Sequence, residues 1–189
     1  MNTPAHLIFA ATAFAQPDNR RRSLAALMGG FAPDFSLYAL TAVSTLLLGI
    51  PAQTVFRGLY YSPAWQQVFA IDNSFILWGV ALTLSIWRRH DIWMVFCAAA
   101  LLHLALDFPL HNHDARPHFW PLTDWVFISP FSYWDRAHHG DIVGWIEWAA
   151  CAGCLFVLWR RFQGFVARVL IALGAVLQLL PTIIWRLIL

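Results

Sequence analysis

The residues best suited to chemistry are histidines and aspartates at helical spacing near the end of one apolar segment. His103 and Asp107 are four positions apart in the stretch HLALDFPLHNHD, so a helix presents both on one face. His111 repeats that spacing, although Pro109 ends or kinks the helix before it, and His113 follows. Imidazole and carboxylate groups arranged in this way can share one divalent ion, as in zinc sites. The alternative is a structural hydrogen-bonded pair between helices.

Two residues near the start of the chain could complete such a site. Asp34 follows Pro33 and a pair of glycines, a pattern that predicts a broken membrane helix lining a protein-filled or wet cavity. Its carboxylate is a candidate metal ligand, or a cap for the helix that follows. His6 is isolated in its segment and is either a further ligand or an ordinary polar residue close to the membrane surface.

Three more polar residues could take part. His118 lies between two prolines in a long loop and is a candidate ligand. His138 and Glu147 are candidates for the general base. Glu147 could equally bridge helices, and the stretch around His138 could simply begin a helix capped by Asp141. Carboxylates inside a membrane cost roughly 2.5–3.5 kcal/mol each at the helix centre, which favours functional roles for them.

Composition sets the environment of these residues. The chain has 189 residues, of which 60% are hydrophobic and 12% are charged, and its mean hydropathy is +0.60. Soluble domains carry about 25% charged residues, so an ordinary soluble domain, a disordered chain and a coiled coil are all excluded. The net charge is +2, all twelve basic residues are arginines, and they form no basic tail, so no nucleic-acid partner is expected.

The apolar pattern predicts an all-α, polytopic transmembrane bundle of about five to six membrane segments, folded as a single domain over residues 1–189. A CxxC motif at Cys151 and Cys154 lies among small residues inside one segment and is interpreted as packing. Two long, aromatic connections, residues 51–72 and 111–141, are expected to lie at the membrane surface. The expected segments are 3–15, 23–50, one ending at Trp87 that starts between residues 64 and 73, 92–110, 142–159 and 165–187.

The arginines predict the orientation. Alternating crossings place the three short connections on one side of the membrane, and these are rich in arginine; the two long loops lie on the other side. Because positive charge favours the cytoplasmic side, the short connections are expected in the cytoplasm and the candidate site near the outer face. The expected partners are the lipid bilayer and a lipid-like substrate, and the oligomeric state is open.

A family resemblance rests on four of these positions. A Thr-Pro-Ala-His start, then Ala-Pro-Asp, then His-x-x-x-Asp resembles the bacterial inner-membrane metal-dependent hydrolases of the YdjM type, and more distantly the zinc-dependent phospholipase C pattern. Ser36 stands where that family usually has a second Asp, and no histidine lies between residues 49 and 72. The resemblance covers roughly the first 125 residues and implies metal ligation by His6, Asp34, His103 and Asp107.

Three functions are therefore carried forward. The first is a metal-dependent hydrolase of the bacterial inner membrane, with a divalent ion such as zinc that activates water against a lipid or lipid-linked phosphoester. The second is a metal-binding or ion-handling membrane protein that performs no hydrolysis. The third is a structural helical protein whose polar residues bond between helices.

Overall fold

The computed structural model describes the backbone of residues 1–188 and the side chains of residues 1–180. Its described part is helical and contains no β-strand, as the apolar pattern predicts. The α-helices are α1 (Thr3–Phe14), α2 (Arg20–Phe31), α3 (Phe35–Ala42), α4 (Ala52–Arg57), α5 (Pro63–Asp72), α6 (Phe75–Trp87), α7 (Asp91–Asp107), α8 (Gly140–Arg161) and α9 (Phe165–Ile188).

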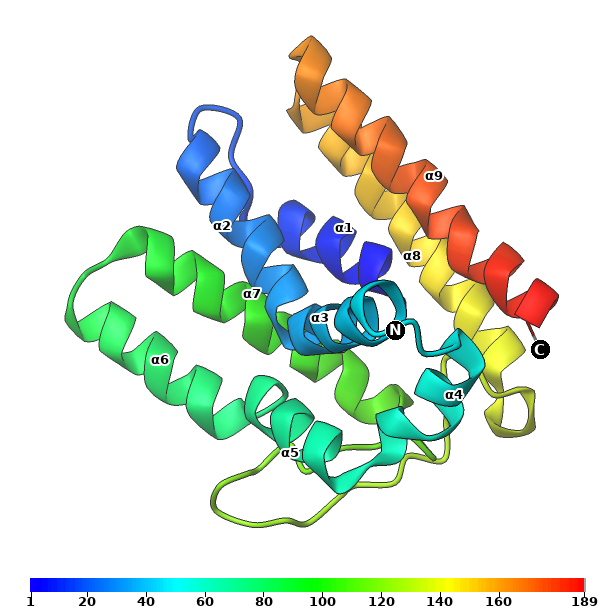
Figure 1. Ribbon diagram of the computed structural model, residues 1–189. Coiled ribbons are helices and arrows are strands. Elements are labelled where there is room, and N and C mark those ends of the chain that lie inside the picture. The colour runs from blue at the N-terminus through cyan, green and yellow to red at the C-terminus, as the bar shows by residue number, and fades with distance from the viewer. Residues whose placement is uncertain (189) are drawn as a thin grey trace.

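The helices pack side by side around α1, which is short and central. α7 lies between α6 and α2, while α1 lies between α2 and α8, and α9 covers the outside of α8 (Figure 1). The buried positions of α1 are Ala5, His6, Ile8 and Ala10, so small and apolar residues surround one imidazole. The first histidine of the chain is thereby placed in the centre of the bundle.

Two glycines on α2 explain how closely these helices approach. A Cβ atom at Gly29 would lie 2.1 Å from the backbone oxygen of Phe96 on α7, and one at Gly30 would lie 2.7 Å from the Cβ of Ala10 on α1. The glycines were expected to break the helix, but α2 continues through them to Phe31. They serve close packing on two sides, as small residues do between membrane helices.

The break comes after the glycines. Residues Ala32–Asp34 form one 3₁₀ turn, η1, in which Pro33 has no backbone N–H to donate. Asp34 occupies the N-cap position of α3, yet its side chain makes no capping hydrogen bond there. Its carboxylate is therefore available to other partners, and the expected capping role is not observed.

Four helical stretches are long and apolar enough to cross a membrane: Arg20–Leu47, Pro63–Trp87, Asp91–Leu110 and Gly140–Arg161. α1 has 12 residues, against roughly 17–25 in a spanning helix. The apolar helix Phe165–Leu180, at the limit of the described side chains, is also shorter than the four. The expected count of five to six spans is not confirmed. Exposed large apolar side chains such as Leu46, Trp87 and Phe165 cover the outer surface.

The two long connections differ. Residues 51–72, expected as a surface loop, are mostly helical, because α4, a 3₁₀ turn at Leu59–Tyr61 and α5 occupy them. Ser74 caps α6 by accepting a hydrogen bond of 3.0 Å from the amide of Leu77. Residues His111–Asp135 form an irregular loop at the end of the bundle where the N-terminus lies (Figure 1).

Candidate metal centre

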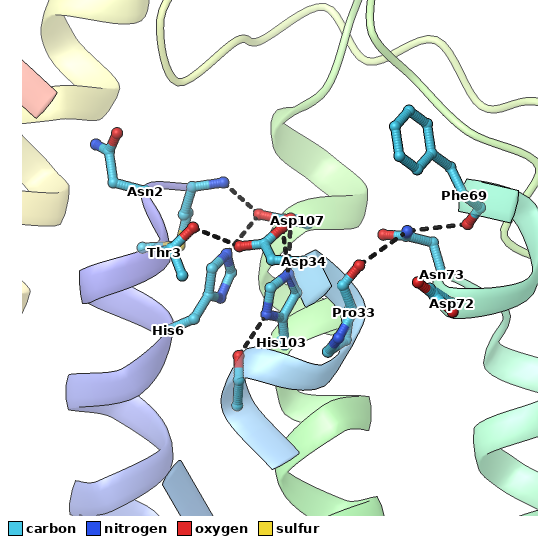
Figure 2. A network of polar contacts seen from close by, with 12 residues as sticks. Asn2, Thr3, His6, Pro33, Asp34, Phe69, Asp72, Asn73, His103 and Asp107 are labelled. Carbon is cyan, nitrogen blue, oxygen red and sulfur yellow. Dashed lines mark hydrogen bonds and ion pairs between the residues drawn. The ribbon is translucent and has the colours of Figure 1, made fainter. Parts of the chain in front are cut away.

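Asp107, the last residue of α7, is the centre of a buried polar cluster. Its Oδ1 atom lies 2.9 Å from Nε2 of His6 and also contacts the amino group of Met1. Its Oδ2 atom lies 3.2 Å from Nε2 of His103 and 3.2 Å from Nε2 of His111. Figure 2 shows the carboxylate of Asp107 between α1 and α7, with His6 and His103 beside it. One aspartate therefore contacts three imidazoles, two of them four residues away along the chain and the third from α1.

His6 and His103 lie against each other as a parallel pair. Their ring centroids are 3.5 Å apart and the ring planes differ by 10°. The Nδ1 atom of His103 lies 2.7 Å from the backbone oxygen of Gly30, a bond in which the carbonyl accepts. Nδ1 is then protonated, and in the neutral imidazole Nε2 carries the free lone pair, as in histidines that bind metals.

Asp34 joins the cluster from η1. Its Oδ1 atom lies 3.8 Å from Nε2 of His103, and its Oδ2 atom accepts a hydrogen bond of 2.5 Å from the hydroxyl of Thr3. Tyr38 donates to the same hydroxyl at 3.0 Å. The side chain of Asp34 is 12% exposed, whereas that of His103 is fully buried. Asp34 is therefore the carboxylate of the cluster that solvent reaches most easily.

His111 approaches Asp107 from the long loop. Its Nδ1 atom lies 2.9 Å from Oδ2 of Asp114, so two carboxylates flank one imidazole. Burial lowers the pKa of His111, but the charge of Asp107 and the contacts with both aspartates outweigh burial and raise it. Conversely, burial favours a high pKa for Asp114, while the His111 contact holds it below its usual value.

The residues fit a divalent ion. His6, His103 and Asp107 each offer one ligand atom within 4.8 Å of the others, and all three residues are buried. Nε2 of His103 makes no hydrogen bond, although it lies buried between the two carboxylates. A buried nitrogen without a partner is costly, and a cation would satisfy it. Two imidazoles and a carboxylate form a ligand set that suits zinc.

Two expected site residues belong to a different group. His113 and His138 lie together with Asp135, and the three offer a second set of possible ligand atoms within 4.8 Å of one another. This group is exposed or half-buried, unlike the cluster around Asp107. The expected ligand His113 and the expected general base His138 thus lie in a surface group, apart from the buried cluster.

His118 has structural partners. Its Nδ1 atom lies 2.8 Å from the backbone oxygen of Asn73, and its own backbone oxygen accepts from the amide of Phe75 at 2.8 Å. Its ring packs against Phe75 and Phe108. Burial lowers the pKa of His118, despite the hydrogen bond to Asn73. The residue joins the long loop to the start of α6 and is absent from both ligand groups.

Glu147 is also bonded elsewhere. Its Oε1 atom accepts hydrogen bonds of 2.7 Å from the side chain of Asn2 and of 2.6 Å from that of Gln178. It is 3% exposed and connects α8 to the N-terminal residues and to α9. This is the helix-bridging alternative considered above, and Glu147 is in neither ligand group.

Sequence reasoning gave no role to Arg116. This residue is 6% exposed; it donates to the hydroxyl of Tyr60 at 3.2 Å, and its guanidinium lies 4.4 Å from the centre of the Phe69 ring. Its Nε atom is buried and makes no hydrogen bond. Among the side chains that the structure describes, no carboxylate forms an ion pair with it. The motif Arg-Pro-His in the loop gave no signal of this burial.

The chain matches no protein-family model, no curated protein and no solved structure.

Proposed function

We propose that the protein is a membrane-embedded, metal-dependent hydrolase that uses a zinc-like divalent ion held by His6, His103 and Asp107. The observation that carries the proposal is Nε2 of His103, a buried lone pair that a backbone carbonyl orients toward two carboxylates. Such orientation through the second ring nitrogen is characteristic of metal-binding histidines. The proposal also agrees with the activity that the YdjM-type resemblance implies.

The residues around the three ligands divide the work. A divalent ion at such a site lowers the pKa of water toward about 7 and provides Lewis acidity. Asp34 is our candidate for the general base, because it is within 3.8 Å of a ligand and partly exposed. Thr3 holds one of its oxygens in place. Asp114 orients His111, which closes the cluster from the loop.

The proposed substrate is a lipid or lipid-linked phosphoester. Arg116 favours a substrate with an anionic group. A buried guanidinium without a carboxylate partner is costly, and planar guanidinium groups bind phosphate well. The long loop also exposes Leu122, Trp125 and Ile128. Apolar and aromatic side chains of this kind settle at membrane interfaces, where a lipid substrate would be presented.

The proposed location is the bacterial inner membrane, with the site toward the periplasm. The support is the distribution of arginines over the described turns. Arg20–Arg22, Arg88–Arg89 and Arg160–Arg161 adjoin the short connections, and Arg88–Arg89 lie at the opposite end of α7 from Asp107. A positive charge excess of this kind marks cytoplasmic loops.

Burial favours a second candidate function, metal binding or ion handling without hydrolysis. The side chains of His6, His103, Asp107 and His111 are 0–11% exposed. A closed site of this kind suits a protein that only holds an ion as well as one that uses the ion for hydrolysis. The two candidates share the ligands and differ in whether Asp34 has a chemical role.

One set of variants tests both candidates. Purified wild type is compared with His103→Ala and Asp34→Asn for bound zinc and for hydrolysis of phospholipid in mixed micelles. We expect His103→Ala to bind less zinc than wild type and to lose activity, and Asp34→Asn to bind as much zinc as wild type but lose at least about a hundredfold in kcat. Metal without hydrolysis in wild type would support the second candidate. Wild type that binds no zinc would refute both.

A further inference from the structure

The loop between α7 and α8 brings its two ends together through polar side chains. His113 comes from the start of the loop, while Asp135 and His138 come from its end. The Oδ2 atom of Asp135 lies 2.8 Å from Nδ1 of His138 and 3.9 Å from Nε2 of His113. The two imidazole rings are 5.2 Å apart and nearly perpendicular.

These distances match the spacing of ligands around one ion. Ligand atoms at about 2.1 Å from a tetrahedral ion are about 3.4 Å from one another. The observed 2.8 Å and 3.9 Å lie on either side of that spacing, so a small rotation of His113 would bring its nitrogen into range. His113 is free to make it, because its side chain is 66% exposed.

The backbone holds the other two ligands in place. The carbonyl oxygen of Asp135 accepts hydrogen bonds from the amides of His138 and Gly140, at 3.0 and 2.9 Å. A Cβ atom at Gly140 would lie 2.8 Å from that same oxygen, so the turn requires glycine there. On the opposite side, the indole of Trp134 donates to Asp114 at 3.2 Å and ties this turn to the His113 segment.

We propose that His113, Asp135 and His138 form a second, solvent-facing site for a borderline divalent transition ion such as zinc. An ion there would replace the proton shared between His138 and Asp135, since bound histidine must be neutral. Water or a ligand from outside the chain would fill the remaining positions. The inference stands apart from the proposed function, because none of the three residues belongs to the buried cluster.

The second ion would fasten the loop. Positions 113 and 138 flank the irregular segment, and His111, two residues before His113, contacts Asp107 of the buried cluster. A cross-link between the two ends of a segment reduces the conformations available to the segment. Occupancy of the surface site would therefore stiffen the segment that covers the buried cluster.

The experiment counts ions in the full-length protein in detergent. Chelator-stripped protein is titrated with zinc alone, and bound zinc and Co²⁺ absorption are measured for wild type, His113→Ala, His103→Ala and the double variant. His113→Ala is the clean variant, because this side chain makes no hydrogen bond to Asp135. The control is His139→Asn, which removes a neighbouring imidazole at φ 64°, a backbone conformation that asparagine tolerates.

We expect two zinc sites in wild type and in His139→Asn. In His113→Ala we expect one site of unchanged affinity, while zinc affinity at the surface site falls at least about tenfold. Loss of a site in His113→Ala but not in His103→Ala would support the surface site and refute the buried one. Equal zinc stoichiometry and affinity in His113→Ala and wild type would overturn the surface site, whatever His103→Ala shows.

Discussion

The Nδ1 atom of His103 on α7 is hydrogen-bonded to the backbone oxygen of Gly30 on α2, at 2.7 Å. The backbone of one helix therefore selects the tautomer of a histidine on the next. The relationship depends on the close approach of the two helices, which the absence of a side chain at Gly29 permits. The geometry at the candidate metal centre is thus controlled by a residue without any polar side chain.

We predict that Gly29→Ala destabilises the protein and weakens metal binding. The new methyl group would meet the backbone oxygen of Phe96, so the helices must separate, at a cost of about 1–3 kcal/mol. The matched control is Gly79→Ala on α6, where nothing lies within 4 Å and alanine favours the helix. Thermal unfolding in detergent and zinc content check this. Similar melting temperatures for the two variants would contradict it.

His118 should make stability dependent on pH. Because burial lowers its pKa in the folded state, the unfolded chain binds a proton more readily, and stability falls as the pH drops through about 6.5. His111 has a raised pKa and contributes with the opposite sign. The stability that it adds to the protein is lost as the pH rises through that raised pKa. Comparison of His118→Asn with wild type isolates the first effect.

The measurement is the melting temperature of each protein between about pH 5 and pH 8, which spans the ordinary histidine pKa. Asparagine keeps a donor for the backbone oxygen of Asn73 but does not titrate. The wild type should lose more stability than His118→Asn on acidification. Parallel curves would show that His118 does not determine the acid sensitivity.

Arg116 should matter for anionic substrates and not for metal binding. We predict that Arg116→Met lowers kcat/KM for a phosphodiester at least about tenfold, or ~1.4 kcal/mol, while zinc content is unchanged. Arg116→Lys keeps the charge but loses the planar fork, so its loss should be smaller. A neutral carboxylic ester of the same chain length is the control substrate. An equal loss on both substrates would point to a structural role.

The topology can be tested with introduced cysteines. In a background in which Cys97, Cys151 and Cys154 are alanine, Leu122→Cys in the long loop should react with an impermeant maleimide in spheroplasts. Arg88→Cys in the α6–α7 turn should react only after the membrane is opened. The reverse pattern would invert the proposed orientation, and reaction of both in intact spheroplasts would contradict the alternation of spans.

The sequence predicted much of the buried cluster because helical spacing is local. His103 and Asp107 share one face of α7, and their side chains lie 3.2 Å apart, as the spacing indicates. That His6 and Asp34 join them depends on how α1, α2 and α7 pack, which spacing along one helix does not encode. For these two residues the sequence left ligation as one of two alternatives, and the family resemblance favoured it.

The sequence does not show that His111 and His113 of the long loop lie in different clusters. His111 and His113 are close neighbours, yet one contacts Asp107 in the bundle and the other faces Asp135 at the surface. The irregular loop has no period from which side-chain directions can be predicted. Glu147 was similarly ambiguous, because its partners Asn2 and Gln178 lie on segments distant in sequence.

The shortness of α1 has a consequence for how the protein is made. Twelve residues at 1.5 Å each give about 18 Å, less than the roughly 30 Å of hydrocarbon that a bilayer presents. α1 contacts α2, α7, α8 and α9, most of which leave the ribosome long after it does. His6 must therefore wait for Asp107 to be synthesised and inserted before the two can meet. The buried cluster can accordingly form only after α7 is in place, about a hundred residues after His6 is made.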